Sequence, residues 1–319
     1  MDWQLDHLDG ATGARLAVRT RTARGEVRAI LILCHGLAEH SGRYARFAEA
    51  MAGAGLAVYA FDHRGHGATT AADAPRGRFS ASDGPARLVK DLGSVREWAA
   101  GRHPACPVIL FGHSMGGLIA LYAAEEEPAA YDGLAVWNSN LDLGLGGHAA
   151  RALLGIERML KGSDVPSTLL PALTFHAWGR AIKGARTPSD WLSRDTAEVD
   201  AYRADPLCGF DASISLWLDV VHLGLQGGRR DRLARLPPTL PVHLVGGTGD
   251  PSTDNGRALN WLALRMRDTG LRDVTCTLYP GMRHETLNEI GREQATSDFR
   301  RWCDGVIDNS RSRAERRAG

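Results

Sequence analysis

Three residues whose side chains together could cleave an ester lie far apart in the sequence, and each closely follows a short apolar run. Ser114 lies in Gly112–Gly116 (GHSMG), which fits the pattern G-x-S-x-G, while Asp250 and His284 occur much later. A serine hydroxyl becomes a good nucleophile when a base takes its proton, and an acid must orient that base. The order Ser114, Asp250, His284 therefore predicts a nucleophile, an acid and a base that act through an acyl-enzyme.

The residues around Ser114 predict a sharp corner between a strand and a helix. The apolar run Val108–Phe111 indicates a buried strand, and Leu118–Ala124 continues as a helix. A serine at such a corner needs small neighbours and presents its hydroxyl above the sheet, next to the first amides of the helix. The alternative is an ordinary glycine-rich turn, which the flanking strand and helix disfavour.

The acid and the base each have a simpler interpretation. Asp250 precedes Pro251 and could serve only to form a turn. Asp254, one helical turn later, is a rival for the acid; we favour Asp250 because it directly ends a strand and its glycine run. His284 could be a solvated loop histidine. The shared order and the position of all three after strands favour the triad.

A tetrahedral oxyanion needs two preorganised N–H donors. The residue after the nucleophile supplies one in this type of site, so we expect the amide of Met115 to be the first donor. The second is expected in the loop that begins at His35, and we nominate the amide of Leu37. The side chains of His35 and His40 are expected to stabilise this turn.

The elements that position these residues alternate between strands and helices, which predicts βαβ units and a mainly parallel sheet. An opening hairpin is expected over 3–8 and 15–20. Further strands are expected at 29–34, 56–61, 108–111, 134–137, 241–245 and 274–279, and helices at 43–54, 83–102, 118–124, 255–268 and 287–307.

The alternation stops after residue 141, where helical patterns follow one another at 149–160, 169–182 and 212–225. We therefore expect an α/β core formed by residues 1–140 and 238–308. Residues 141–237 would form a helical cap above the carboxyl ends of the strands, where open α/β sheets bind ligands. The basic tail, 309–319, lacks apolar residues that could dock it and is expected to be disordered.

The composition of the 319 residues limits the classes of partner and compartment. A formal net charge of +1 disfavours nucleic acid as a partner. The five cysteines are scattered, and neither a secretory signal nor an apolar run of about 18 residues is visible, so a cytoplasmic protein is expected. The sequence says nothing of oligomeric state.

Two further motifs suggest other chemistry and are set aside. Asp62–Gly67 (DHRGHG) brings two histidines and an aspartate together, but their spacing is not that of a metal site on a helix, and we expect a turn held by Asp62 and Arg64. Gly144–Ala149 fits G-x-G-x-x-A, yet no strand leads into it, so dinucleotide binding is rejected. No metal and no cofactor are expected.

The motifs His35–Tyr44 (HGLAEHSGRY), Asp62–Gly67 and Gly112–Gly117, with the Asp250 and His284 loops, resemble the monoglyceride lipase and lysophospholipase branch of the α/β hydrolases. The resemblance covers nearly the whole chain and is weakest in the cap. It implies an α/β-hydrolase fold, a triad that cleaves esters of long-chain acyl glycerols without a cofactor, and a second oxyanion amide at Leu37.

This sequence departs from that family at three places. The family commonly has glycine where this chain has Ala38, and a smaller residue in place of Leu37; Asn138–Asn140 (NSN) also differs from the expected run of small residues. An alanine tolerates positive φ poorly. The geometry of the oxyanion turn and the substrate preference are therefore the features that these differences affect.

The sequence thus predicts a serine hydrolase of lipid-like esters such as monoacylglycerol or lysophospholipid. The alternatives are a short-chain carboxylesterase or polyester-oligomer hydrolase, then a thioesterase or aminopeptidase; a non-enzymatic scaffold is disfavoured by the complete triad. Most apolar side chains of the cap are expected to pack it onto the core, and some are expected to line an acyl pocket. The candidates are Leu153, Leu154, Ile156, Leu169, Leu170, Leu173, Phe175, Trp178 and Ile182. A transient contact of the cap with a membrane surface is a further hypothesis, because Arg180 and Lys183 lie near these residues.

Overall fold

The computed structural model describes residues 3–318, and its centre is a sheet of eight strands in the order β1-β2-β4-β3-β5-β6-β7-β8. The first two form an antiparallel hairpin, β2 pairs antiparallel with β4, and all other neighbours are parallel. The strands are β1 (Gln4–Asp9), β2 (Arg15–Arg21), β3 (Ala29–Cys34), β4 (Leu56–Phe61), β5 (Val108–His113), β6 (Gly133–Trp137), β7 (Val242–Gly247) and β8 (Val274–Tyr279).

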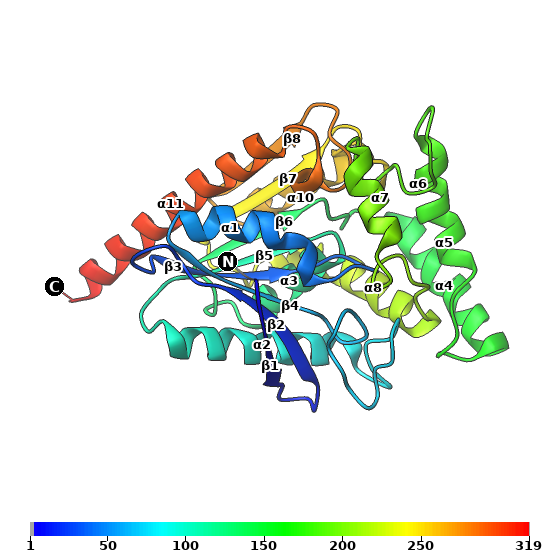
Figure 1. Ribbon diagram of the computed structural model, residues 1–319, viewed down its shortest axis with the longest axis horizontal. Helices are drawn as coiled ribbons and strands as arrows, with labels where there is room; N and C mark the ends of the chain where they lie inside the picture. Colours follow the sequence, from blue (N-terminus) through cyan, green and yellow to red (C-terminus); the bar gives the residue numbers. More distant parts are fainter. Residues whose placement is uncertain (1–2, 319) are drawn as a thin grey trace.

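Helices cover both faces of this sheet and extend beyond one of its edges (Figure 1). They are α1 (Ala45–Gly53), α2 (Gly84–Arg102), α3 (Met115–Glu126), α4 (Gly144–Lys161), α5 (Leu169–Leu173), α6 (Phe175–Ala181), α7 (Thr196–Ala204), α8 (Ile214–Gly227), α9 (Arg230–Leu233), α10 (Arg257–Asp268) and α11 (Arg292–Ala318). Short 3-10 turns occur at η1 (Ser41–Tyr44), η2 (Pro251–Thr253) and η3 (Thr286–Asn288). The predicted α/β-hydrolase architecture is confirmed.

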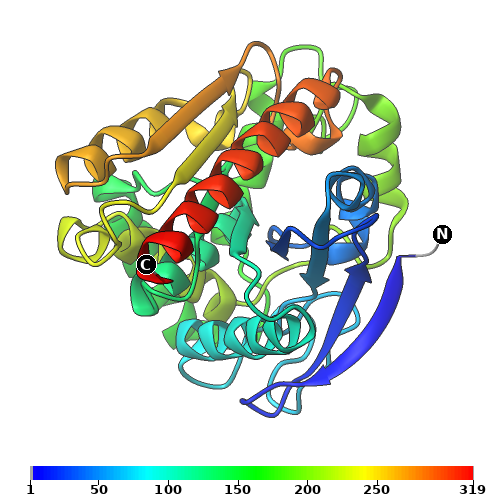
Figure 2. The same ribbon diagram turned by 90° about the vertical axis from the view of Figure 1, so that its left-hand side faces the viewer.

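The central strands read as continuous apolar runs because both of their faces are buried. Along β3, Ile30 and Ile32 face one apolar cluster, while Leu31 and Leu33 face the other, as the two-residue period of a strand requires. The first cluster includes residues of α2, α3, α8 and α10, and the second includes residues of α1 and α11. The sheet is therefore enclosed by two layers of helices (Figure 2).

Parallel pairing brings the carboxyl ends of the central strands together. Cys34 at the end of β3 pairs with Gly112 of β5, and His113 of β5 pairs with Trp137 of β6. The loops that follow β3, β5, β6, β7 and β8 consequently start from one edge of the sheet. These loops carry every residue that the sequence nominates for chemistry.

Six helices, α4 to α9, stand between β6 and β7, which is the interval predicted for the cap. Helices α4 to α7 lie together at one end of the molecule, to the right in Figure 1. Helix α8 packs against both α3 and α4 and so joins this group to the core. The division into core and cap at residues 141 and 237 stays a prediction.

Helix α11 continues to Ala318, whereas the sequence predicts a disordered tail from residue 309. The buried residues Phe299, Cys303 and Ile307 anchor the first part of this helix, so the unfavourable step of helix nucleation is already complete before the tail begins. Extending a helix costs far less than starting one, and the tail contains alanine, arginine and glutamate, which favour helices. The same helix begins later than expected, at Arg292.

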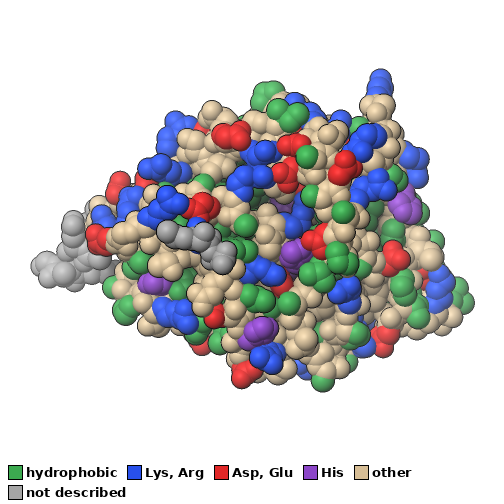
Figure 3. All heavy atoms as spheres, in the orientation of Figure 1, with side chains coloured by type: hydrophobic (Ala, Val, Ile, Leu, Met, Phe, Trp, Pro, Cys, Tyr) green, Lys and Arg blue, Asp and Glu red, His purple; other side chains and the backbone are tan. Residues whose placement is uncertain are grey.

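Charged side chains of both signs are interspersed over the face seen in Figure 3. Among the described residues, no helix is long and apolar enough to cross a membrane.

Candidate active site

Ser114 lies at the corner between β5 and α3, in the backbone conformation φ 55°, ψ −121°. A Cβ at Gly112 would collide with the carbonyl of Gly116, and one at Gly116 would collide with the carbonyl of Cys34. Both positions therefore need glycine, and this explains the two glycines of the pentapeptide. The Ser114 N–H donates to Trp137 O at 2.8 Å, which fixes the strained corner against β6.

The structure brings the three predicted residues together. The Oγ of Ser114 lies 2.9 Å from Nε2 of His284, and Nδ1 of His284 lies 3.0 Å from Oδ2 of Asp250. His284 and Asp250 are buried. The rival acid, Asp254, instead lies at the surface and pairs with Arg257. Such a chain of hydrogen bonds can pass the serine proton to the imidazole.

The carboxylate of Asp250 accepts four hydrogen bonds besides being buried. Its Oδ1 accepts from the N–H and the hydroxyl of Ser252, at 2.9 and 2.7 Å, and its Oδ2 accepts from Asn138 Nδ2 at 3.2 Å and from His284. Burial raises the pKa of Asp250, but His284 and these hydrogen bonds outweigh it, so the pKa is lowered. The acid is therefore held ionised, and the imidazole proton lies on Nδ1.

Asn138 and Ser252 were not nominated from the sequence. Asn138 directly follows β6, has φ 50°, and accepts a hydrogen bond from Thr286 at 3.0 Å as well as donating to Asp250. It occupies the same place after its strand as Ser114 does after β5, and that position is the signal that could have identified it. The hydroxyl of Ser252 also lies 2.8 Å from His284 Nδ1.

The amides nominated for the oxyanion are both free. Within the described residues, the N–H groups of Leu37 and Met115 have no hydrogen-bond partner, and both residues line the cavity that Ser114 enters. Ala38 does adopt a positive φ of 54°. Its carbonyl accepts from Gly209 N at 2.9 Å and from the hydroxyl of Tyr202 at 3.2 Å, so the turn is held from the cap side.

A buried ionic network lies behind this turn. Arg43 binds Glu39 at 2.7 Å and Glu285, next to His284, through two bonds of 2.6 and 2.7 Å. Glu39 also accepts from the N–H of Gly36 at 2.5 Å. Burial raises the pKa of Glu39, but the bond to His113 and the charge of Arg43 hold it well below its usual value. Ion pairs between Arg43 and the carboxylates of Glu39 and Glu285 therefore join the oxyanion turn to the loop that carries His284.

Above Ser114 the core and the cap enclose a cavity of about 410 Å³. Its walls are mostly apolar, and five of the nine cap residues named above line it, namely Leu153, Leu170, Leu173, Phe175 and Trp178. Leu154, Ile156, Leu169 and Ile182 are not among the lining residues. Further apolar lining residues are Leu118 from α3, Leu143, and Trp217, Val220 and Val221 from α8. A cavity with apolar walls and the serine hydroxyl at one point fits an acyl chain rather than a charged ligand.

The segment Asp62–Gly67 is a structural turn. Asp62 accepts from the N–H and the hydroxyl of Ser41 at 2.8 and 2.6 Å and pairs with Arg19. The Arg64 side chain is fully buried and donates to the carbonyl of Phe79 at 2.7 Å. These bonds explain why the motif contains an aspartate and an arginine.

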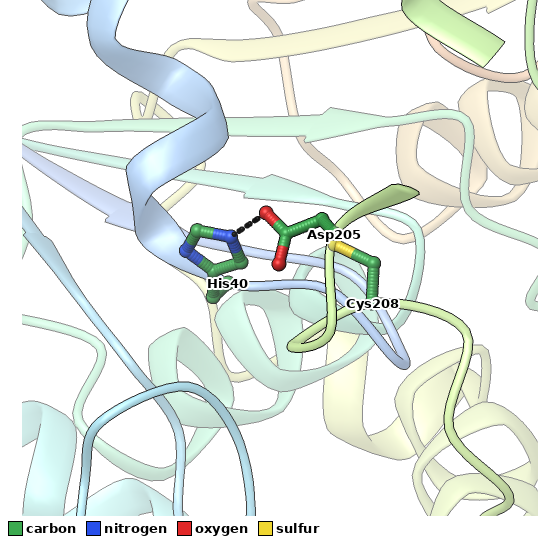
Figure 4. Close-up of side chains that lie close together, drawn as sticks. All are labelled: His40, Asp205 and Cys208. Carbon is green, nitrogen blue, oxygen red and sulfur yellow. Dashed lines mark hydrogen bonds and ion pairs between the residues drawn. The ribbon is translucent and has the colours of Figure 1, made fainter. Parts of the chain in front are cut away.

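One group of described residues, His40, Asp205 and Cys208, brings together the ligand atoms that a metal ion prefers (Figure 4). Nδ1 of His40 accepts a hydrogen bond from Gly42 N, so its proton lies on Nε2 and is donated to Asp205 at 2.9 Å. A histidine that binds a metal through one ring nitrogen donates a hydrogen bond from the other. If Nε2 of His40 bound a metal, Nδ1 would have to donate, but here Nδ1 accepts. The group therefore ties the oxyanion loop to the loop after α7.

An eight-stranded, mostly parallel sheet with a serine, a histidine and an aspartate joined above its edge defines the class of α/β hydrolases. The family described as "Serine aminopeptidase, S33" matches residues 25–291, and the chain belongs to this family. The protein is thus a serine hydrolase, and more specifically a lipase or esterase of the α/β-hydrolase fold.

Several relatives are named as monoacylglycerol or monoglyceride lipases. The chain is 29% identical over 296 residues to a monoacylglycerol lipase of Mycolicibacterium smegmatis, covering 92% of this chain and 94% of the relative. It is 30% identical over 286 residues to the human monoglyceride lipase, covering 90% and 85%. A thermostable carboxyl esterase of Bacillus coagulans, solved with glycerol, shares the fold with a TM-score of 0.83 at 24% identity, over 96% and 99% of the two chains.

Proposed function

We propose that the protein hydrolyses carboxylic esters of lipid-like acyl chains, such as those of monoacylglycerol or lysophospholipid, through an acyl-enzyme on Ser114. The observation that carries the proposal is the chain of hydrogen bonds Ser114–His284–Asp250 opening onto an apolar cavity. The monoglyceride lipases among its relatives support the same substrate class.

In the proposed reaction, Nε2 of His284 takes the proton of Ser114 as its Oγ attacks the ester carbonyl. The amides of Leu37 and Met115 donate to the oxyanion, and the buried carboxylate of Asp250 stabilises the imidazolium. The C–O bond to the alcohol breaks as His284 returns the proton to the leaving oxygen. Water, deprotonated by the same imidazole, then hydrolyses the acyl-enzyme to the free acid.

The experiment compares wild type and Ser114→Ala on p-nitrophenyl esters of increasing chain length, on a monoacylglycerol and on an aminoacyl amide. We expect the alanine variant to lose roughly 10⁴- to 10⁶-fold in kcat. The long-chain esters and the monoacylglycerol should have the highest kcat/KM. Near-full activity of the alanine variant would exclude Ser114 as the nucleophile, and a maximum at acetate or propionate would favour the short-chain carboxylesterase.

An aminopeptidase needs a carboxylate that holds the free ammonium of its substrate. Four aspartates of the cap could serve this purpose, but each is committed elsewhere. Asp164 pairs with Arg78, Asp195 with Arg292 and Asp205 with His40, while Asp190 accepts hydrogen bonds from Arg186 N and from the hydroxyl of Thr187. Among the described residues that line the cavity, Asp142 alone is acidic. Because the rest of its walls are mostly apolar, the cavity favours an ester with an uncharged acyl chain over an aminoacyl amide.

Large apolar side chains on the outside of the cap support a transient contact with a lipid surface. On α4, the side chains of Leu145, Met159 and Leu160 are 88%, 87% and 79% exposed, and the neighbouring Arg158 and Lys161 are basic. Apolar and basic side chains on one helix are typical of peripheral membrane binding. We expect Met159→Glu to weaken sedimentation with anionic vesicles and to leave hydrolysis of a soluble ester unchanged; equal sedimentation would exclude this contact.

A further inference from the structure

The loop that carries His284 is bound to the cap through its own backbone. The N–H of His284 donates to Trp191 O at 3.3 Å, and the N–H of Glu285 donates to Leu192 O at 2.7 Å. The rings of Trp191 and His284 also lie against each other, with centroids 4.8 Å apart. A segment of the cap, residues 190–194, thus runs beside the predicted base; we call it the brace segment.

Side chains strengthen this contact on both sides of His284. Arg283 donates from Nη1 to the carbonyls of Asp190 and Ser193, at 2.6 and 3.1 Å. The hydroxyl of Ser193 in turn donates to Asn288 O at 2.8 Å. The residues before and after the histidine are therefore both bonded to the brace segment.

Glu289 links the loop that carries His284 to the end of the brace segment. Its carboxylate is fully buried and accepts four hydrogen bonds: from Arg194 N and Nε, both at 2.9 Å, from Arg283 N at 2.9 Å and from Ile290 N at 2.8 Å. A carboxylate has about four acceptor positions, and each is used here. One anionic side chain therefore binds the residue that precedes His284 and the end of the brace segment at once.

The core holds other atoms of the same loop. His113 Nε2 lies 3.0 Å from His284 O, and Asn138 donates to Arg283 O at 3.4 Å. Around the histidine, the core thus binds the carbonyls of Arg283 and His284, whereas the brace segment and Glu289 bind the amides of residues 283–285. Both sets of contacts are needed to fix a loop that has no regular secondary structure of its own.

We propose that the brace segment positions the general base, and that Glu289 and Arg194 are positioning residues of the ester hydrolysis. This inference rests on the proposed function, because it takes His284 as the base. A base must remain within a few tenths of an ångström of its place, and a displacement near 1 Å can cost about 100-fold in rate. The cap therefore contributes to the chemical step as well as to the walls of the pocket.

The test measures kcat, KM and the rate of fluorophosphonate labelling of Ser114 for Glu289→Gln, Arg194→Gln and Arg194→Lys. An amide replaces one acceptor oxygen of Glu289 with an NH2 group, which would face N–H donors and cannot accept from them. Glu289→Gln should therefore lower kcat and the labelling rate about 10- to 100-fold with little change in KM. Arg194→Gln should show a smaller loss in the same two quantities, which Arg194→Lys partly restores, because lysine can still donate to Glu289.

Two control variants separate positioning from general loss of stability. Arg78→Gln removes another ion pair between core and cap, with Asp164 at 2.8 Å, and should change kcat less than twofold. Val306→Ala creates a small cavity under α11, away from the site, and lowers Tm without slowing acylation. The proposal is overturned if Glu289→Gln and Arg194→Gln lose no more activity than Val306→Ala at a comparable loss of Tm.

The side chain of Arg194 is 35% exposed, so we expect Arg194→Gln to fold. This variant therefore tests the positioning role even if Glu289→Gln does not fold. Ser114→Ala gives the separate answer on the function itself. If that variant keeps its activity, the proposed function fails whatever the brace variants do. If it is inactive while the brace variants are fully active, the function stands and only the positioning role fails.

Discussion

Three imidazoles packed behind the oxyanion turn should make the protein lose stability in mild acid. The ring of His35 lies 4.3 Å from that of His63 and 5.2 Å from that of His66, and all three residues are buried. In the described part of the chain, neither ring nitrogen of His63 has a hydrogen-bond partner, nor has Nε2 of His66. Burial, and then the charge of His35, lower the pKa of His66 to about 3 and that of His63 well below its usual value.

The size of the effect follows from the unfolded chain. An unfolded imidazole has a pKa of about 6.5, so at pH 5 it is protonated, while His66 in the folded protein is still neutral. Because the folded pKa is the lower one, the full stability is present above pH 6.5 and is lost as the pH falls towards 3. One such group costs about 1.36 × 1.5, or about 2 kcal/mol, between neutral pH and pH 5. His63 adds to the loss with the same sign.

The assay is urea unfolding of wild type and His66→Asn at pH 7.5 and pH 5.0. The asparagine amide can replace Nδ1 in the bond to Arg64 O, and it carries no proton to titrate. We expect the variant to be less stable at pH 7.5, because it loses the ring contacts with Phe79 and Phe210. Its loss of unfolding free energy on going to pH 5.0 should nevertheless be about 2 kcal/mol smaller than that of wild type.

The matched control is His148→Asn, which changes an exposed histidine and should keep the wild-type difference between the two pH values. If His66→Asn also keeps the wild-type difference, buried neutral imidazoles do not cause the acid sensitivity and the reasoning is refuted.

Three further substitutions address the site itself. Asp250→Asn should lower kcat about 10³- to 10⁴-fold with KM little changed, because the amide no longer fixes the Nδ1–H tautomer of His284; a loss below tenfold would contradict the role of the acid. Ala38→Gly should raise the unfolding free energy by about 0.5 kcal/mol in urea titrations. Glycine relieves about 1–2 kcal/mol of backbone strain at positive φ, which exceeds the cost of the greater entropy of the unfolded chain. A loss of stability would mean that the alanine is unstrained. Val221→Phe narrows the cavity and should shift the preferred p-nitrophenyl ester to a shorter chain, whereas an unchanged preference would place the acyl chain elsewhere.

The sequence was informative wherever a local pattern decides the structure. Apolar runs of four to six residues identify the central strands because these strands are buried on both faces. The two glycines around Ser114 are required by a collision that any side chain would cause. The order of the triad then follows from the order of the strands. Each of these inferences needs only neighbours in sequence or a known topology.

The roles of Asn138 and Ser252 are not evident from a local pattern, because the contact of Asn138 with Asp250 and that of Ser252 with His284 join residues from different loops. Asn138 reaches Asp250 only because β6 and β7 are adjacent and end together. The brace segment is a stronger case, since residues 190–194 belong to no regular element and show no periodicity. Its bonds to His284 and Glu285 join residues more than 90 positions apart in sequence.

The contacts of the cap also predict which part of it moves. Within the described residues, every hydrogen bond of α5 and α6 stays inside residues 167–182. Phe175 and Trp178 of α6 contact Trp191, Trp217 and His284 through their rings. Apolar contacts have no preferred direction and permit sliding, whereas displacing the brace segment breaks its bonds to His284 and Glu285.

We therefore expect substrate to enter by displacement of α5 and α6 while the brace segment keeps its place. Amide hydrogen exchange should be markedly faster across residues 169–181 than at the N–H groups of His284 and Glu285, which are bound to the brace segment. A covalent acyl analogue on Ser114 that fills the cavity should slow exchange in α5 and α6 selectively. Equal exchange in the two regions, with or without the analogue, would mean that the cap moves as one body, and the base would then have to move with it.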